Sequence, residues 1–256
     1  MSFYEPLGSD GTRWWATTHT TGPWDPGFQH GGPPSALLGR AVERCAPRED
    51  TVVARVTVEI LGAVPVGELD LTARVTRPGR SVELVEASLS AQGRDVAVAR
   101  AWRVRRTEGV TVAPRAAAPP PLPAQGESGP VEGWGDGYLS AVEWRLVSGH
   151  WLEPGPATAW SRLRQSVVPD EEPSGLQRLL AVADSGNGLS SELDLREWHF
   201  INPELTVHVH RQPVGEWVCV DAVTTVGETG LATTRLSDLD GPVGVGAQSL
   251  LVAPRP

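Results

Sequence analysis

Long runs of alternating apolar and polar residues are the dominant pattern of this chain. Between residues 51 and 62, Val56, Val58 and Ile60 alternate with charged and hydroxyl side chains, as expected of a half-buried strand. Similar runs cover residues 69–76, 82–91 and 95–104 in the first half, and 143–146, 158–165, 204–211, 216–225, 231–238 and 243–252 in the second. The pattern therefore predicts two meanders of antiparallel strands.

Two segments have helical periodicity instead. In "PPSALLGRAVERC" (33–45), Leu37, Leu38, Ala41 and Val42 recur at helical spacing behind two prolines that suit a helix start. In "SGLQRLLAVAD" (174–184), leucines and valine form a second apolar stripe, and Ser174 is a candidate N-cap. A helix followed by a strand meander, present twice, predicts an α+β fold.

The two halves also resemble each other in sequence. "GELDLTARVTRPG" begins at Gly67 and "GEWVCVDAVTTVG" begins at Gly215, an offset of 215 − 67 = 148 residues. A repeat of this length indicates two copies of one domain rather than a solenoid. We expect a pseudo-dimer within one chain, with a first domain at residues 1–106, a Pro/Ala/Gly-rich linker at 107–132 and a second domain at 133–256.

Composition limits the classes of function. The formal net charge of −9 argues against nucleic acid as a partner. The sequence has no signal-peptide pattern and no apolar stretch long enough for a membrane span. Cys45 and Cys219 lack zinc-site spacing and are expected to be buried free thiols in a reducing compartment. These features predict a cytoplasmic protein.

Three segments carry a resemblance to a known family. They are "FQHGGPPSALLGRAVE" (28–43), "NPELTVHVHRQPVGEWVCVDAVTT" (202–225) and "DGPVGVGAQSLLV" (240–252). Together they resemble the acyl-CoA thioesterases with a double hotdog fold, in which two helix-wrapped antiparallel sheets pair. The resemblance implies acyl-CoA or a related acyl thioester as substrate and no cofactor, and it allows a homo-oligomer of double-hotdog protomers.

The family uses an Asp, a Thr or Ser and a Gln of the second hotdog to activate a water molecule. Carried over by position, these roles fall on Glu204, Thr225 and Gln248, and Thr224 is an alternative to its neighbour. A carboxylate can accept a proton from water, and hydroxyl and amide groups can hold that water or the developing oxyanion. The first-copy counterparts of Thr225 and Gln248 are Arg77 and Ala101, so we expect only the second half to be catalytic.

The residues His30, Gly31 and Gly32 form a second candidate group, for substrate binding. They lie at the predicted helix start, where free N–H groups can bind a carbonyl or phosphate oxygen, although a tight turn needing glycine explains them equally well. Asp184 lies at the end of the second helix. It is expected mainly to cap that helix, at the border of the acyl site.

Two other groups of residues give weaker indications of a binding site. Glu204, His208 and His210 lie on one face of a strand, but the spacing is strained for a shared metal ion and no third ligand is evident, so no metal site is predicted. Four arginines near the end of the first half could bind the phosphates of coenzyme A: Arg100, Arg103, Arg105 and Arg106. The simpler interpretation is that they form a solvated strand edge.

The sequence thus predicts thioester hydrolysis by an activated water, without a metal or covalent intermediate. Two alternatives stay open at this point. One is a non-catalytic acyl-binding protein, suggested by glutamate at position 204 where the family has aspartate. The other is a hotdog dehydratase or hydratase, which would need an Asp and a His placed for proton transfer.

Overall fold

The computed structural model describes residues 1–109, 112, 116–124, 137–151 and 153–255. The first half contains β1 (Tyr4–Pro6), β2 (Arg13–Ala16), a 3-10 turn (Thr18–Thr20), α1 (Gly32–Arg44), β3 (Thr51–Ile60), β4 (Glu68–Arg77), β5 (Val82–Ala91) and β6 (Arg94–Arg105). The second contains α2 (Tyr138–Ala141), β7 (Val142–His150), β8 (Glu153–Leu163), α3 (Gly175–Ala183), α4 (Gly186–Leu189), β9 (Trp198–Ile201), β10 (Glu204–Val209), β11 (Trp217–Val226), β12 (Gly230–Asp238) and β13 (Gly241–Pro254). The predicted strands and both predicted helices are confirmed.

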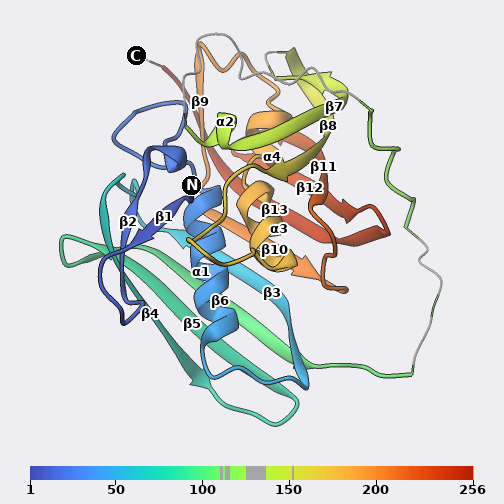
Figure 1. The fold of residues 1–256 in the computed structure, drawn as a ribbon. Helices are drawn as coiled ribbons and strands as arrows, with labels where there is room; N and C mark the ends of the chain where they lie inside the picture. The colour runs from blue at the N-terminus through green and yellow to red at the C-terminus, as the bar shows by residue number, and fades with distance from the viewer. Residues whose placement is uncertain (110–111, 113–115, 125–136, 152, 256) are drawn as a thin grey trace.

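The strands form one continuous antiparallel sheet whose order is mirrored about its centre. The order is β1-β2-β4-β5-β6-β3 and then β10-β13-β12-β11-β8-β7, with β9 pairing with β13 beside this path. At the centre, Thr57 of β3 lies opposite Thr206 of β10. The two segments that repeat in the sequence fall on β4 and β11, which occupy corresponding places in the two halves (Figure 1).

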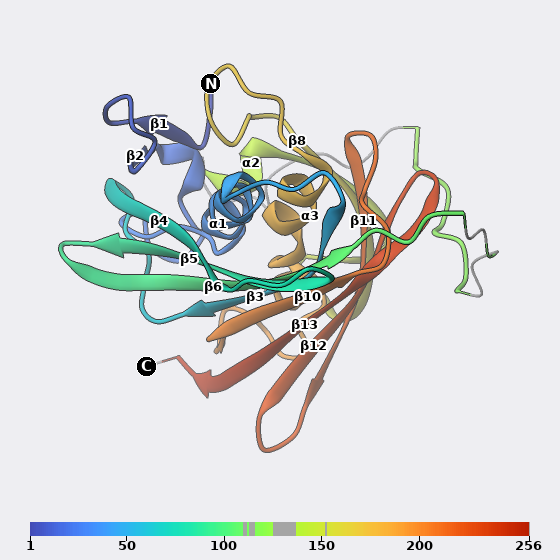
Figure 2. The ribbon, with the colours of Figure 1, turned by 90° about the horizontal axis from the view of Figure 1, so that it is seen from below.

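Both long helices lie on the same side of this sheet, next to each other (Figure 2). They are antiparallel, because Gly32 at the start of α1 meets Ala181 near the end of α3, while Glu43 near the end of α1 accepts hydrogen bonds from Ser174 and Gln177. A Cβ on Gly39 would come within 2.5 Å of Leu180 Cδ1. The helices therefore pack closely, and the positive dipole end of α1 lies beside the negative end of α3.

The start of α3 is capped as predicted. The Ser174 hydroxyl accepts a hydrogen bond from the Gln177 amide at 3.1 Å. This satisfies one of the free N–H groups at the helix start. The apolar stripe of α3 is buried, and this fixes the rotation of the helix about its axis. The rotation in turn sets the direction of the Asp184 side chain, because Asp184 follows the last residue of α3.

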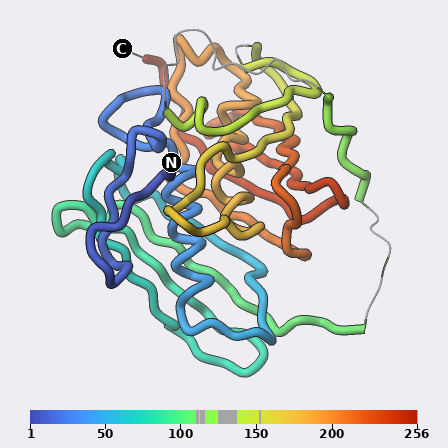
Figure 3. The backbone as a smooth tube through the Cα atoms, viewed as in Figure 1, coloured from blue at the N-terminus to red at the C-terminus, as the bar shows by residue number. Residues whose placement is uncertain are grey.

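Residues 116–124 of the predicted linker lie along the outside of the second half (Figure 3). Trp160 Nε1 donates to the Pro120 carbonyl at 3.1 Å, and Leu122 packs against Trp160, Trp217 and Cys219. Burial raises the pKa of the Cys219 thiol to about 12, so this thiol is unreactive. Residues 110–111, 113–115 and 125–132 of the predicted linker lie outside the described residues.

Cys45 differs from expectation. It is only partly buried, since it follows α1 at the helix end, and both cysteines are free thiols. No helix in the described ranges combines the length and apolarity needed to cross a membrane.

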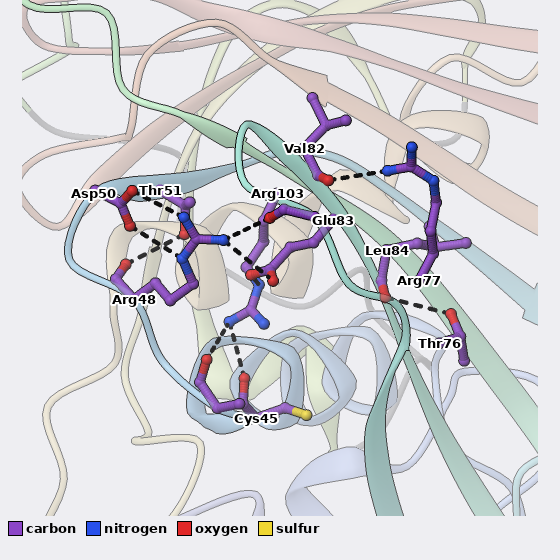
Figure 4. Close-up of polar contacts among 12 residues, drawn as sticks. Cys45, Arg48, Asp50, Thr51, Thr76, Arg77, Val82, Glu83, Leu84 and Arg103 are labelled. Atoms are coloured by element: carbon purple, nitrogen blue, oxygen red, sulfur yellow. Dashed lines mark hydrogen bonds and ion pairs between the residues drawn. The ribbon is translucent and has the colours of Figure 1, made fainter.

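A buried ion pair stabilises the end of α1 (Figure 4). Arg103 is 3% exposed and Glu83 is 5% exposed, and Arg103 Nε lies 2.9 Å from Glu83 Oε1. Arg103 Nη1 also donates to the Cys45 carbonyl at 2.9 Å, which satisfies one of the free carbonyls at the end of α1. Arg103 is therefore structural and does not reach a phosphate from solvent, whereas Arg100 is an exposed partner of Glu86.

We expect Arg103→Ala to lower the free energy of unfolding by about 3 kcal/mol, because it removes the closer partner of the buried Glu83 carboxylate and leaves it only the longer contact with Arg48, at 3.5 Å. Arg100→Ala breaks an exposed pair and is the matched control, with an expected loss of about 1 kcal/mol or less. Urea denaturation of both variants tests this. Similar losses for the two arginines would contradict a structural role specific to Arg103.

Candidate active site

A largely apolar cavity of about 420 Å³ opens where the start of α1 meets the end of α3. Both halves of the chain contribute apolar side chains to its wall: Trp24, Phe28, Ile60, Leu61, Val64, Leu139, Trp151, Leu195, Phe200 and Ile201. The polar groups at the wall include His30 before α1, Asp184 after α3 and Asn202 between β9 and β10. A deep apolar cavity with a few convergent polar groups is the usual form of a small-molecule site.

Asp184 is the centre of the polar cluster. It follows the last residue of α3, and it is only 4% exposed. Its Oδ1 accepts hydrogen bonds from Asn202 Nδ2 at 2.7 Å and from Gln248 Nε2 at 3.1 Å. Its Oδ2 has no hydrogen-bond donor among the described residues. One oxygen thus fixes the carboxylate, and the other is left to accept a proton.

Gln248 links this carboxylate to the sheet. It is 1% exposed and lies on the helix-facing side of β13. Its Nε2 also donates to the Asp184 carbonyl at 3.1 Å, and its Oε1 accepts from the Asn187 amide at 3.1 Å. The expectation that this buried glutamine requires polar partners is confirmed. Its hydrogen bonds join it to Asp184 and to the amide of Asn187.

His30 stands on the other side of Asp184. Its Nδ1 lies 3.5 Å from Asp184 Oδ2 and accepts a hydrogen bond from the Gly32 amide at 3.0 Å. Burial lowers the pKa of His30, and the nearby Asp184 opposes this shift only in part. The ring is therefore neutral with its proton on Nε2, which has no acceptor among the described residues.

The His30 ring is held by a stack. It lies parallel to the Tyr138 ring, with 3.9 Å between centroids and 9° between planes. The Tyr138 hydroxyl donates to the Ala181 carbonyl at 2.8 Å and lies 2.9 Å from Ser185 Oγ. Burial raises the pKa of Tyr138, so this hydroxyl stays protonated. Tyr138 thus ties His30 to the end of α3.

The start of α1 offers one free amide to the cavity. Pro33 and Pro34 have no N–H group, and the Gly32 amide is used by His30. The N-cap residue Gly31 lines the cavity, and its amide has no acceptor among the described residues. A Cβ on Gly31 would lie 2.5 Å from Asp184 Oδ2. Glycine is thus needed here for the close approach of α1 to the carboxylate.

The expected convergence of Glu204, Thr225 and Gln248 is wrong for the first two residues. Glu204 lies on the sheet face away from the helices, where its Oε1 accepts from the Ser249 amide at 2.8 Å and its Oε2 from Thr206 Oγ1 at 3.0 Å. Thr225 is exposed on that same outer face, because Thr224 takes the inward position of β11 and bonds Ser190. The carboxylate that reaches Gln248 is Asp184.

Asn202 is the residue that sequence reasoning missed. It lies in the turn between β9 and β10, and Pro203 follows it. An Asn-Pro pair between strands predicts a turn and carries no sign of contact with a carboxylate 18 residues earlier. His208 and His210 are on the outer face, and the part of the chain that is described contains no cluster of three metal-ligating side chains.

Two family models match this chain. The acyl-CoA thioesterase N-terminal domain matches residues 20–104, and the acyl-CoA thioesterase C-terminal domain matches residues 113–252. The second alone covers more than half of the chain. The chain therefore belongs to the acyl-CoA thioesterase family and is a thioesterase-type hydrolase.

Solved structures resemble the chain over nearly its whole length. A conserved protein with a hot dog fold from Alicyclobacillus acidocaldarius superposes with a TM-score of 0.75 at 16% identity, covering 98% of this chain and 96% of that one. Acyl-CoA thioesterase II TesB2 from Mycobacterium marinum gives 0.66 at 16% identity, covering 98% and 94%. The tesB protein of Mycobacterium avium subsp. paratuberculosis gives 0.67 at 15%, covering 99% and 96%. These likenesses show a hotdog fold.

No protein with curated annotation matches the chain.

Proposed function

We propose that this chain is a double hotdog in which Asp184 activates a water molecule to hydrolyse an acyl-CoA or related acyl thioester. The two hotdogs are residues 1–106 and 133–256, joined by the linker 107–132 into a pseudo-dimer. The mirrored strand order and the separate family matches to the two halves support this division. The observation that carries the chemistry is the Asp184 carboxylate, with one oxygen held by two amides and the other open.

In this mechanism the acyl chain occupies the apolar cavity and the thioester carbonyl faces the start of α1. The Gly31 amide and His30 Nε2–H donate hydrogen bonds to the carbonyl oxygen, and these strengthen as negative charge develops there. A water molecule gives its proton to Asp184 Oδ2 while its oxygen attacks the carbonyl carbon. The C–S bond then breaks, the thiolate takes the proton from Asp184, and the carboxylic acid leaves.

The two alternatives can be weighed against this site. The non-catalytic reading rested on Glu204, and that residue lies outside the cluster. A hydratase would use the His30–Asp184 pair, which does stand beside an apolar cavity. In that pair Nδ1 is occupied by the Gly32 amide, so His30 faces the cavity as a proton-bearing donor rather than as a base. The geometry favours hydrolysis.

A panel of saturated and 2-enoyl acyl-CoAs tests this proposal. We expect release of free thiol, measured with a thiol reagent, from at least one chain length. Hydration of the enoyl double bond without thiol release would favour the hydratase. Tight acyl-CoA binding without either reaction would favour the binding protein.

Asn202→Ala should lower kcat about 10- to 100-fold, the cost of one hydrogen bond to a charged group. The reason is that Asp184 Oδ1 would keep only its Gln248 partner and the carboxylate would turn. Ser249→Ala, an exposed change on the outer face of β13, is the control and should act as wild type. Unchanged kcat in Asn202→Ala would remove Asn202 from the site.

A further inference from the structure

An arginine and a tryptophan meet at the rim of the cavity. Trp24 lines the cavity and is 52% exposed. The guanidinium carbon of Arg255 lies 4.8 Å from the centre of the Trp24 ring. The Arg255 amide donates to the Glu197 carbonyl at 2.7 Å, and its Nε donates to the carbonyl of Leu195, another rim residue, at 2.9 Å. Its main chain and Nε are therefore fixed.

The rest of this guanidinium group is unused. Nη1 and Nη2 of Arg255 have no acceptor, and no carboxylate lies within ion-pair distance, among the residues that the structure describes. Three other arginines that stack on tryptophan, Arg40, Arg145 and Arg162, are each neutralised by a glutamate. Arg255 thus keeps a full positive charge beside the entrance of the substrate cavity.

Within the described part of the chain, Arg255 is an unpaired positive charge in an acidic protein, and two charged side chains near it are already engaged. The chain has a formal net charge of −9, so an anionic ligand is repelled by the molecule as a whole and needs a local cation. Nearby Arg196 is already paired with Asp194. The Asp25 carboxylate, next to Trp24, is turned toward the Gly27 amide at 2.7 Å. Among the described residues at this rim, Arg255 is left as the cation with free donors.

We propose that Trp24 and Arg255 form the subsite that binds the nucleotide end of a coenzyme A carrier. A guanidinium fork is suited to phosphate oxygens, and a half-exposed indole ring is suited to contact with the adenine base. The subsite lies at the rim, where the carrier emerges while the acyl chain fills the cavity. This inference rests on the proposed function for the position of the thioester.

The test compares the same acyl group on coenzyme A and on pantetheine, which lacks both phosphates and adenosine. For Arg255→Gln, which keeps a donor for the Leu195 carbonyl, kcat/KM for acyl-CoA should fall about 10- to 100-fold, mainly through KM. The value for acyl-pantetheine should change less than about twofold, because that substrate makes no contact with the subsite.

Arg77→Gln is the matched control. Arg77 stacks on Trp102 at 5.6 Å and likewise has no carboxylate partner among the described side chains, but it lies on β4, away from the cavity. It should leave both substrates unaffected. Equal losses on both substrates in Arg255→Gln, or no loss on either, would overturn the subsite while leaving hydrolysis standing.

Binding of free coenzyme A, measured by calorimetry, separates this inference from the proposed reaction. Wild type should bind coenzyme A at least about 10-fold more tightly than Arg255→Gln, and added salt should reduce the difference. This result is expected even if neither thioester is hydrolysed. Equal affinities for coenzyme A would refute the subsite whatever the activity.

Discussion

Asp184→Asn is expected to reduce thioester hydrolysis by about 10²–10⁴-fold, the usual contribution of a general base. An amide at this position can still pair with Asn202 or Gln248, so the cluster keeps its shape, but it cannot accept a proton from water. The loss should appear in kcat rather than KM, since the acyl chain is bound by the apolar wall of the cavity. Steady-state kinetics with a thiol reagent measure it.

Glu204→Gln and Thr225→Ala are the controls for this experiment. Both residues resemble the family's catalytic positions in sequence, and both lie on the outer face of the sheet. We expect each variant to keep wild-type kcat. A large loss in Glu204→Gln together with an active Asp184→Asn would mean that the sequence alignment, and not the geometry, identifies the base.

Gly31→Ala should lower kcat/KM by about 10²-fold. The Gly31 backbone has φ −67° and ψ −17°, which alanine adopts without strain, so the helix start itself tolerates the change. The new methyl group, however, would lie 2.5 Å from Asp184 Oδ2. Either α1 or the carboxylate must move, and a displacement of about 1 Å from catalytic geometry costs roughly this factor.

Gly227→Ala is the matched control for that substitution. Gly227 lies in an open turn where the nearest atom to a new Cβ is 4.0 Å away. Thermal denaturation should show that both alanine variants are folded at the assay temperature, and only Gly31→Ala should lose activity. Full activity in Gly31→Ala would show that α1 does not approach the catalytic carboxylate as described.

The elements of this fold could be predicted because their signals are local. Alternation with period two identified the strands, the stripe beginning at Leu176 identified α3, and Ser174 was recognised as its cap. The repeat beginning at Gly67 and Gly215 placed corresponding strands in the two halves. Each of these inferences needs only neighbouring residues or a comparison of the chain with itself.

The site was only partly predictable because it depends on register and packing. A shift of one residue exchanges the two faces of a strand, and this separates Thr224 from Thr225 and places Glu204 on the outer face. Gln248 was recognised because a glutamine in an apolar run needs a partner. That the partner is Asp184 follows only from the position of α3 against β13, and that His30 joins them follows only from the packing of α1 against α3.

Single-turnover hydrolysis in ¹⁸O-labelled water tests the central claim most directly. If a water activated by Asp184 attacks the thioester carbonyl, the free acid from the first turnover carries one ¹⁸O and the protein carries none. If the Asp184 carboxylate itself attacked, a mixed anhydride would form, and water attacking its aspartyl carbonyl would put the label into Asp184 and release an unlabelled first acid. Mass spectrometry of the acid and of the peptide containing Asp184 distinguishes the two, and a labelled peptide would contradict the account.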